Sequence, residues 1–151
     1  MNRLLSQRKI ISLILLFIIV AATFLSCGNG NIDENSAYTS SDEVAAYLNA
    51  YGRLPENFIT KDEAKVLGWD STLGNLNEVA PGKSIGGDRF GNYEGLLPEK
   101  EGRIYYECDI NYNGGFRGRE RLVWSNDGLI YYSGDHYESF TLLYGTEEAN
   151  P

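Results

Sequence analysis

The sequence contains few of the residues that build metal sites and disulfide scaffolds, with two cysteines and one histidine among 151 residues. Two cysteines cannot form a disulfide-rich scaffold or a cysteine-based zinc module. One histidine and scattered carboxylates lack the spacing of metal ligands, so we expect neither a metal nor another cofactor. The chain also lacks a glycine-rich phosphate loop and a nucleophile elbow.

Basic residues are also scarce, since 13 Lys and Arg stand against 21 Asp and Glu, a formal charge of −8. Phosphates attract basic surfaces, so this balance argues at first against a nucleic-acid-binding protein. What the sequence does contain is 42% hydrophobic and 13% aromatic residues, which excludes a disordered chain. Its length allows one domain of ordinary size with a real core.

The N-terminus has the pattern of an export signal. Arg3, Arg8 and Lys9 precede a largely apolar run at residues 10–25 that carries no charge. As a helix this run would be about 24 Å long, which is short of the roughly 30 Å bilayer core. We therefore predict a signal peptide at residues 1–26, with a permanent signal anchor as the alternative.

The end of this segment resembles a bacterial lipoprotein cleavage site, because Ser26 follows apolar residues and precedes Cys27. On this interpretation Cys27 is lipidated and holds the protein at the outer face of the bacterial membrane. Ordinary cleavage near Ala22 or Ser26 is the alternative and predicts a secreted, extracellular protein. Removal of residues 1–26 takes away three basic and no acidic residues, so the charge of −8 becomes −11.

The remaining chain divides by composition. Residues 27–38 are polar and rich in Gly and Asn, which predicts a flexible tether. Residues 145–151 predict a disordered tail. The folded part is therefore predicted at residues 39–144, as a single domain and a monomer.

Helices are predicted in the first half of this domain. Ser40 with Glu43, and Thr60 with Glu63, have the spacing of capping boxes, in which two side chains satisfy backbone groups at a helix start. The corresponding helix ends are predicted at two glycines, Gly52 and Gly68. A weaker third helix is predicted at residues 76–80.

Strands are predicted in the second half, where hydrophobic residues alternate with polar ones. The set predicted to face the core is Ile104, Tyr106, Cys108, Ile110 and Tyr112, and the set predicted to face a polar surface or a cleft is Tyr105, Glu107, Asp109 and Asn111. An Asp-Gly turn at residues 125–128 predicts a hairpin, and residues 140–144 predict a last strand. Helices followed by strands indicate an α+β domain with an antiparallel sheet.

Polar residues of this domain suggest phosphodiester cleavage. Glu107 is predicted mid-strand opposite the core set, and His136 is the only histidine. Arg117, Arg119 and Arg121 cluster in the segment between them, and Lys61 is predicted in the first turn of the second helix. A carboxylate and an imidazole can exchange protons with the reacting oxygens, while cations stabilise the charge on phosphorus oxygens. The alternatives are a solvated glutamate, a surface histidine and a salt-bridged arginine face.

The sequence of this domain resembles the barnase-like extracellular guanyl-preferring ribonucleases of bacilli. The resemblance runs from about Asp42 to Thr141, and its clearest stretches are YGRLPENFITKDEAKVLGW, GNLNEVAPGKSIGGDRFGNYEG and DINYNGGFRGRERLVWSNDGLIYYSGDHYESFT. It implies N-terminal helices packed on a five-stranded antiparallel sheet.

The resemblance also implies catalytic roles. Glu107 matches the general base that takes the proton of the ribose 2′-hydroxyl, and His136 matches the general acid that protonates the departing 5′-oxygen. The cations around the scissile phosphate match Arg117, Arg121 and Lys61. The expected product is a 2′,3′-cyclic phosphate, and no metal is needed because the nucleophile belongs to the RNA.

Guanine recognition is implied for the segment Phe90, Gly91, Asn92, Tyr93 and Glu94, with Tyr137 near the bound base. Considered alone, this segment is simply a turn. Asp88 and Asp109 match acids that hold the catalytic cations in place. Tyr93 departs from the family, since barnase has an arginine there.

The sequence thus predicts a secreted or surface-tethered endoribonuclease that cuts single-stranded RNA 3′ of guanosine. The alternative is a tethered binding protein that keeps the fold and has lost efficient catalysis. The expected partners are RNA and a barstar-like intracellular inhibitor, with the membrane contacted only through the signal peptide or a lipid at Cys27. The charge of −11 then predicts a positive cleft on an otherwise negative protein.

Overall fold

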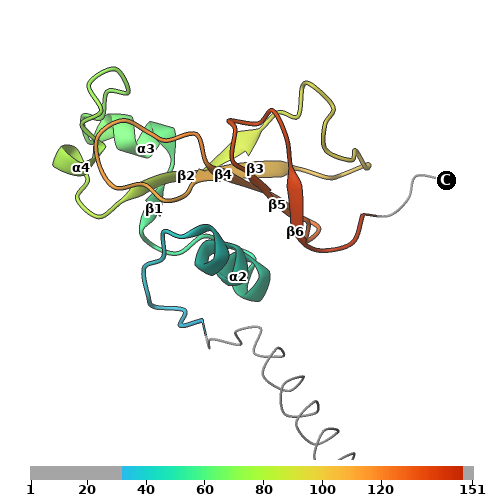
Figure 1. Cartoon of the computed structure of the whole chain (residues 1–151). Coiled ribbons are helices and arrows are strands. Elements are labelled where there is room, and N and C mark those ends of the chain that lie inside the picture. Colours follow the sequence, from blue (N-terminus) through green and yellow to red (C-terminus); the bar gives the residue numbers. More distant parts are fainter. Residues whose placement is uncertain (1–31, 148–151) are drawn as a thin grey trace, which may run out of the picture. The chain divides into compact units, whose positions relative to one another are not determined.

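The structure is a computed structural model that describes residues 32–147. The predicted signal peptide, Cys27 and the last four residues of the predicted tail lie outside these residues. None of the helices within residues 32–147 is long and apolar enough to cross a membrane. In chain order the elements are α2 (Ser41–Tyr51), β1 (Phe58–Ile59), α3 (Lys61–Val66), α4 (Leu76–Val79), β2 (Ser84–Phe90), β3 (Tyr105–Asp109), β4 (Arg121–Ser125), β5 (Ile130–Ser133) and β6 (Thr141–Tyr144) (Figure 1).

The six strands form one sheet in the order β1-β2-β3-β4-β5-β6. Every neighbouring pair is antiparallel except β1 and β2, which run parallel. Short connections can join consecutive antiparallel strands, as at the Asp-Gly turn between β4 and β5, where Gly128 has a φ of 98°. The predicted α+β class, the hairpin and the last strand are confirmed.

The strand number differs from the predicted five because of β1. This strand has only two residues and pairs Phe58 with Ser84 and Ile59 with Ile85. Two residues are too few to show an alternating pattern, so the sequence gives no periodic signal there. The strand extends the sheet at its edge just before α3 begins, and it therefore fixes where that helix starts.

The helices begin where the capping boxes predict. In α2 the Ser40 hydroxyl accepts a hydrogen bond from the Glu43 N–H at 3.4 Å, and Gly52 ends the helix with a φ of 66°. In α3 both halves of the capping box form between Thr60 and Glu63. The backbone of α3 therefore starts at Lys61, which places this cation in the first turn.

One face of the sheet packs on α2. The buried side chains there come from the helix and from alternate strand positions: Val44, Ala45, Leu48, Phe58, Cys108, Ile110, Leu122, Trp124 and Ile130. Cys108 is 1% exposed and behaves as the predicted small hydrophobe, and burial raises the pKa of its thiol. A second buried cluster joins α3 and α4 to the start of β2 through Ala64, Trp69, Leu76, Ala80 and Ile85.

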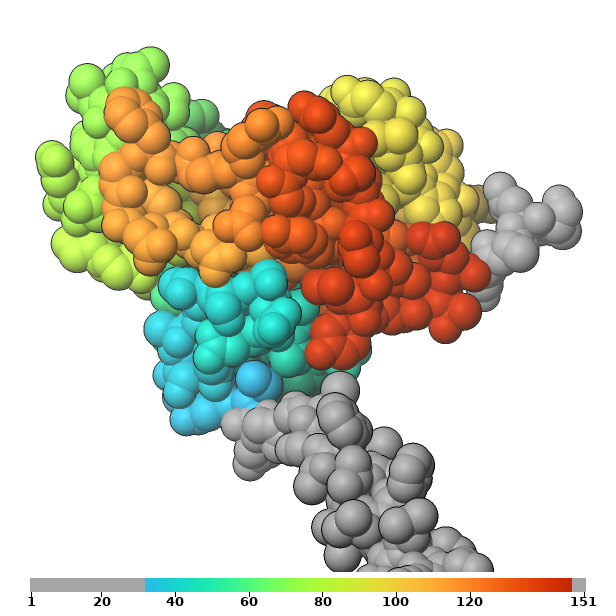
Figure 2. Space-filling view, viewed as in Figure 1, coloured from blue at the N-terminus to red at the C-terminus, as the bar shows by residue number. Residues whose placement is uncertain are grey.

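The opposite face of the sheet is also covered, although the alternation predicted a polar surface or a cleft there. Tyr105, Val123 and Tyr131 form a third buried cluster with Leu97 and Leu129. Leu97 belongs to the long connection between β2 and β3, which is yellow in Figure 2 and lies beside the red C-terminal segment. This cover leaves Glu107 only 7% exposed, so the polar side chains of this face are partly enclosed.

A β-bulge shapes β2 near the predicted site. Gly86 pairs with Cys108 but Asp88 pairs with Glu107, so Gly87 is the extra residue. Gly87 has a φ of 96°, a backbone conformation that favours glycine. The bulge sets Asp88 directly across from Glu107.

The chain before α2 contacts the domain. The Tyr47 hydroxyl donates to the Glu34 carbonyl at 2.9 Å, and the Tyr51 hydroxyl donates to the Ile32 carbonyl at 2.7 Å. Arg53 forms an ion pair with the Glu34 carboxylate at 2.9 Å. Residues 32–38, the described part of the predicted tether, therefore lie against α2.

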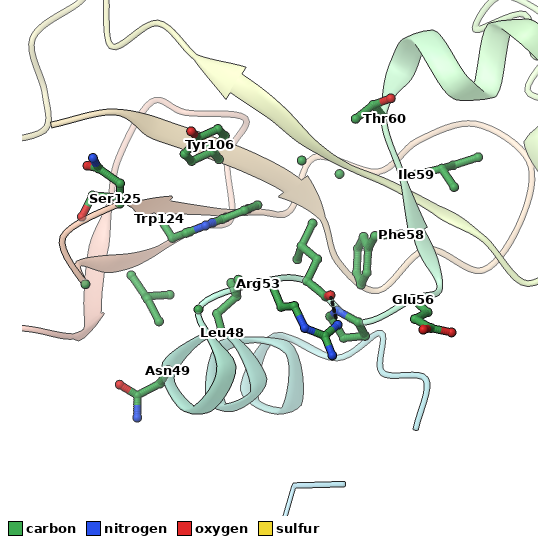
Figure 3. Close-up of a pocket in the computed structure, with 18 of the residues that line it drawn as sticks. Leu48, Asn49, Arg53, Glu56, Phe58, Ile59, Thr60, Tyr106, Trp124 and Ser125 are labelled. Carbon is green, nitrogen blue, oxygen red and sulfur yellow. Dashed lines mark hydrogen bonds between the residues drawn. The ribbon is translucent and has the colours of Figure 1, made fainter. Parts of the chain in front are cut away.

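A groove of about 730 Å³ lies between the end of α2 and the sheet (Figure 3). Its lining includes Leu48 and Phe58, and the stacked rings of Tyr106 and Trp124, whose centroids are 5.7 Å apart. Tyr106 and Trp124 stand on the α2 face of the sheet, opposite Glu107, because side chains alternate along a strand. The groove is therefore separate from the candidate site.

Candidate active site

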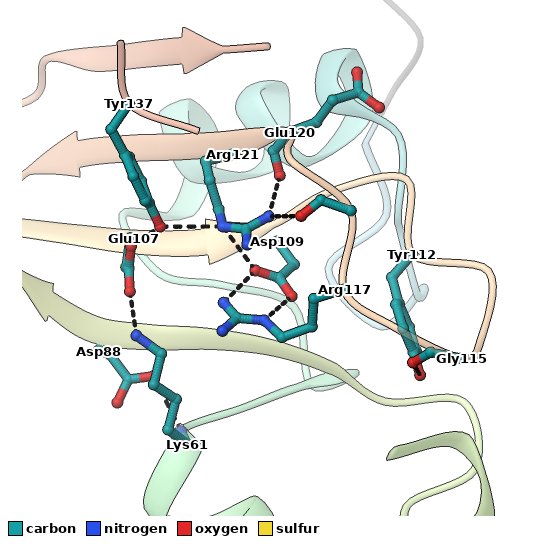
Figure 4. A network of polar contacts seen from close by, with 11 residues as sticks. Lys61, Asp88, Glu107, Asp109, Tyr112, Gly115, Arg117, Glu120, Arg121 and Tyr137 are labelled. Carbon is teal, nitrogen blue, oxygen red and sulfur yellow. Dashed lines mark hydrogen bonds and ion pairs between the residues drawn. The ribbon is translucent and has the colours of Figure 1, made fainter. Parts of the chain in front are cut away.

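Glu107 lies at the centre of the polar group, in the middle of β3 (Figure 4). Its Oε1 forms an ion pair with the Lys61 ammonium, and its Oε2 accepts a hydrogen bond from the Tyr137 hydroxyl. These partners come from α3 and from the segment after β5, 46 and 30 residues away. A carboxylate has about four lone-pair positions, so Glu107 keeps acceptor capacity after both contacts.

Lys61 is held at its backbone as well as at its side chain. Its N–H donates to the Asp88 carboxylate at 3.0 Å, which satisfies one of the free donors in the first turn of α3. Because the β2 bulge places Asp88 across from Glu107, one acid holds the lysine backbone while the other binds the ammonium. Asp88 is predicted to hold a catalytic cation in place, and in the structure it contacts Lys61 directly.

Asp109, two residues further along β3, binds both predicted phosphate-binding arginines. The Arg117 Nε and one of its Nη atoms each lie 2.6 Å from the Asp109 carboxylate oxygens, and the Arg121 Nε lies 3.0 Å from Oδ1. Asp109 and Arg121 are each 2% exposed. Burial lowers the pKa of Arg117, but its hydrogen bonds to Asp109 outweigh this and leave that pKa raised.

Each arginine keeps donors that could bind an anion. Arg117 uses Nε and Nη2 on Asp109, while Arg121 uses Nε and Nη1 on Asp109, Tyr137 and two backbone carbonyls. Within residues 32–147 no hydrogen bond is made by the remaining Nη of either side chain. A guanidinium fixed at one edge in this way can present its free edge to a phosphate.

Arg119 does not join this group, although the sequence clusters it with the other two. Its guanidinium donates to the Asp135 carbonyl at 2.8 Å and to the Glu138 carboxylate at 3.2 Å. Its backbone carbonyl accepts from the His136 N–H at 3.2 Å. Arg119 therefore braces the segment that carries His136.

His136 and Tyr137 both have left-handed backbones, with φ values of 64° and 74°. Such conformations cost about 1–3 kcal/mol each and persist only where surrounding contacts impose them. The Tyr137 N–H donates to the Ser133 hydroxyl at 2.8 Å, and the two rings lie 4.8 Å apart. Within residues 32–147 the His136 ring nitrogens make no hydrogen bond, so they are available to a substrate.

Asp135 organises this segment, and sequence reasoning missed it. Its carboxylate accepts from the Ser133 hydroxyl at 2.9 Å, from the Ser139 N–H at 3.0 Å and from the Ser139 hydroxyl at 2.5 Å. These hydrogen bonds, those from Ser139 above all, lower the pKa of Asp135 to about 2. An aspartate flanked by serines at two and four residues is a local turn signal that could have revealed it.

Tyr137 contributes more than the predicted aromatic face. Its hydroxyl donates to Glu107 and accepts from the Arg121 Nε at 3.0 Å, so it links the two parts of the network. Burial and the hydrogen bond to Glu107 raise the pKa of this hydroxyl. Its ring lies 5.2 Å from the Phe90 ring, which brings the predicted base-binding residues together.

The segment Phe90–Glu94, which we name the 90–94 loop, is closed by the side chain of Asn92. Its amide donates to the Leu97 carbonyl at 2.9 Å and accepts from the Leu97 N–H at 3.0 Å, and its φ is 47°. The Asn92 side chain is therefore engaged inside the protein, and only backbone groups of this residue can face a ligand. Glu94 is exposed and Tyr93 is 95% exposed.

One cavity of about 530 Å³ brings most of the predicted residues together. It is lined from the 90–94 loop, from β3 and from the segment after β5, including Glu94, Glu107, His136 and Tyr137. Lys61 and Arg121 adjoin the cavity, because they contact its lining residues Glu107 and Tyr137, and Arg117 is joined to Arg121 through Asp109. Asp88, Glu107 and Asp109 contact these three cations, so the network by itself carries no excess of positive charge. A positive cleft, as predicted from the sequence, would need cations beyond these three. Within residues 32–147 no group of His, Cys, Asp or Glu is arranged to hold a metal ion.

Comparison with known proteins bears directly on this arrangement. A family model described as ribonuclease matches residues 41–144, which is the region that builds the cavity. The chain belongs to the ribonuclease family. The family resemblance predicted from the sequence is thereby confirmed.

Individual relatives agree with this assignment. The chain is 60% identical over 102 residues to a ribonuclease of Bacillus intermedius, covering 68% of this chain and 63% of that protein. It is 60% identical over 102 residues to a ribonuclease of Heyndrickxia coagulans, of which it covers 94%. A guanyl-specific ribonuclease St of Saccharopolyspora erythraea is 40% identical over 57 residues, covering 37% of this chain and 56% of that protein. The matched region thus spans less than two thirds of the Bacillus relative.

Proposed function

We propose that this protein is an endoribonuclease that cuts single-stranded RNA 3′ of guanosine without a metal ion. The observation that carries the proposal is the single cavity lined by Glu107, His136 and the 90–94 loop. Membership of the ribonuclease family supports cleavage of an RNA phosphodiester bond. The guanyl-specific relative supports the preference for guanosine.

In the first step the bond between phosphorus and the 5′-oxygen breaks, and a new bond forms between phosphorus and the 2′-oxygen. Glu107 accepts the proton of the 2′-hydroxyl while that oxygen attacks phosphorus, and His136 gives a proton to the departing 5′-oxygen. The products are a 2′,3′-cyclic phosphate and a free 5′-hydroxyl. Water then opens the cyclic phosphate, with His136 as the base and Glu107 as the acid, so both groups return to their starting states.

Two contacts and its burial prepare Glu107 for its role. Lys61 and Tyr137 hold its two oxygens, and burial at 7% exposure keeps bulk water from competing for the carboxylate. A fixed base needs no reorganisation when the substrate arrives, which is the physical basis of preorganised catalysis. Substrate binding adds the 2′-hydroxyl as a further donor to the same carboxylate.

The phosphate position is set by the arginines. Asp109 orients Arg117 and Arg121 so that their free edges remain available for the non-bridging oxygens. These cations stabilise the charge that develops on phosphorus oxygens during attack. The reaction requires the 2′-hydroxyl, so DNA is excluded as a substrate.

Guanine recognition is assigned to the 90–94 loop. Backbone N–H groups of the loop and the Glu94 carboxylate face the edge of the base, while Phe90 and Tyr137 provide aromatic faces. The hydrogen bonds between Asn92 and Leu97 hold the loop in shape. Tyr93 replaces the arginine of barnase-like relatives and removes one cation from this region.

The purified mature protein tests the proposal with the dinucleotides GpU and ApU. We expect GpU to be cut faster than ApU, and Glu107→Gln and His136→Ala each to lower kcat/KM at least about 100-fold. Glu101→Gln, an exposed acid outside the cavity, serves as the control and keeps full activity. Equal cleavage of GpU and ApU would refute the guanine preference, and active Glu107 and His136 variants would refute the mechanism.

The binding-protein alternative is tested by the same assay, since a protein that only binds RNA leaves GpU intact. We further propose export through residues 1–26, either with lipid at Cys27 or with secretion into the medium. Mass spectrometry of the mature N-terminus distinguishes these two forms. A barstar-like inhibitor inside the producing cell, and a monomeric enzyme outside it, complete the proposal.

A further inference from the structure

A second cavity, which we name the flanking cavity, lies beside the 90–94 loop. Its volume is about 700 Å³, within the range of ligand-binding pockets. It is lined by residues 89–93 and, on the other side, by residues 99–100 and 103–105. Residues 89–93 line the candidate active site as well, so the end of β2 and the loop form a wall between the two cavities.

Register places the neighbouring side chains of Arg89 and Phe90 on the two faces of β2, and both of these residues line both cavities. Phe90 pairs with Tyr105 and packs 5.2 Å from Tyr137. Arg89 pairs with Tyr106 and therefore projects from the opposite face of β2. A side chain at Gly91 would collide with the Tyr93 ring, so that ring lies against Gly91 at the rim of both cavities.

Arg89 has the properties of a phosphate-binding group. It is exposed, and within residues 32–147 its guanidinium makes no hydrogen bond and no ion pair. By contrast, the cations of the catalytic network are paired with acids, Lys61 with Glu107 and both Arg117 and Arg121 with Asp109. The neighbouring arginine of the flanking cavity, Arg103, is paired with Asp127. The flanking cavity also holds Glu99 and Lys100, but because neither forms an ion pair with Arg89 in the part of the chain that the structure describes, the donors of this guanidinium stay available to an anion.

Tyr93 has the properties of a stacking platform. It is 95% exposed, yet its ring lies against Gly91 and lines both cavities. An aromatic ring this exposed can stack with a nucleobase of any kind. Arg89 and Tyr93 together offer what one nucleotide needs, a cation for its phosphate and a flat surface for its base.

We propose that the flanking cavity binds the nucleotide on the 5′ side of the guanosine, with Arg89 contacting the phosphate between the two nucleotides and Tyr93 stacking on the added base. This inference rests on the proposed function. The 5′ direction follows from the layout of β3. The scissile phosphate, which is 3′ of the guanosine, lies with the arginines at the Asp109 end, whereas the flanking cavity opens at the Arg103–Tyr105 end.

The phosphate contact is tested by comparing cleavage of GpU with that of 5′-phosphorylated pGpU. We expect the wild-type kcat/KM to be about tenfold higher for pGpU, as for a charge-assisted hydrogen bond, and the gain to shrink with added salt. In Arg89→Gln the ratio should fall to about twofold or less. Arg53→Gln, an exposed arginine paired with Glu34 beside α2, is the matched control and keeps the tenfold ratio.

The stacking contact is tested by adding a base, with UpGpU compared with pGpU. We expect a further gain of about tenfold for the wild type and for Tyr93→Phe, which keeps the ring, and its loss in Tyr93→Ser. Ratios between substrates are used because they cancel any general effect of a substitution on catalysis.

The outcomes separate this inference from the proposed function. If the wild type does not cut GpU, the proposed function fails and the inference fails with it. If GpU is cut but a 5′ phosphate gives no gain, or if Arg89→Gln keeps the whole gain, only the inference is overturned. A gain confined to the 3′-extended substrate GpUp, unchanged in Arg89→Gln, overturns it equally.

Discussion

Asp109→Asn is the sharpest test of how the site is held together. Asp109 is 2% exposed and accepts three close contacts from Arg117 and Arg121. The asparagine has the same shape but no charge, so two guanidinium groups would remain close together with no acid between them. Breaking a buried ion pair by removing one partner costs about 3–5 kcal/mol.

The magnitude can be compared with a matched pair in the same domain. Asp127 binds one arginine, Arg103, through both carboxylate oxygens, and its side chain is 34% exposed. The asparagine oxygen and water at this more exposed position can still accept from Arg103, whose own side chain is 7% exposed, so we expect Asp127→Asn to cost about 1–3 kcal/mol. The two variants differ in the burial of the acid and in the number of arginines left without it, so the larger loss is expected for Asp109→Asn on both grounds.

Urea unfolding at 25 °C and pH 7 measures both losses. A domain with about 10 kcal/mol of stability, the middle of the usual range, still folds in either variant, so activity can be assayed as well. We expect Asp109→Asn to lower kcat/KM on GpU at least about tenfold, because Arg117 and Arg121 lose their common anchor. A loss of unfolding free energy below about 1 kcal/mol, no larger than for Asp127→Asn, would refute the reasoning.

Three further predictions concern the surrounding contacts. Asp135→Ala should lower kcat at least about tenfold, because its hydrogen bonds from Ser133 and Ser139, which brace the segment that carries His136, are lost, while Asp33→Ala, in a similar turn beside α2, should leave kcat unchanged. Asn92→Ala removes two hydrogen bonds that close the 90–94 loop, so it should lower the unfolding free energy by about 1–3 kcal/mol and raise KM for GpU. A lower melting temperature without a change in KM would contradict this. The hydrogen bond from Arg103 lowers the pKa of Asp127 to about 2, below its unfolded value near 3.8, so its stabilisation is complete above pH 4 and is lost as the pH falls toward 2. The difference in urea midpoint between wild type and Asp127→Asn should therefore shrink between pH 5 and pH 2.5, and a constant difference would disprove the assignment.

Local signals predicted most of the secondary structure. The capping box at Thr60 and Glu63 forms as predicted, and the Asp-Gly turn joins β4 to β5. These signals work because a helix start and a tight turn satisfy their backbone groups with neighbours in the sequence. The short strand β1 gave no such signal, since its two residues are defined only by pairing with β2.

The second face of the sheet was harder to predict. The alternation placed Tyr105, Glu107 and Asp109 on a common face, which is correct, but it gave no means of predicting the cover over that face. Leu97 and its neighbours belong to a connection without periodic pattern, and such a connection buries side chains only once the sheet exists. The burial of Glu107 and Asp109 is therefore a tertiary property.

The residues of the candidate site were available from the sequence through the family resemblance, whereas their contacts were not. Lys61 and Glu107 are 46 residues apart, and they meet because the β2 bulge and the start of α3 bring them together. The role of Asp135 in shaping the His136 backbone and the separation of Arg119 from Arg121 emerged only from the folded chain.

By itself the sequence determined the helix starts, the strand faces, the hairpin and the family, because each depends on residues close together or on the whole pattern of residue types. Tertiary structure alone decided, for residues 32–147, which acid holds which cation, that the His136 ring nitrogens make no hydrogen bond, and that Arg89 lines two cavities without an ion pair. The physical reason is that pairing of charges depends on sheet register and on chain connections of tens of residues, which no local pattern encodes.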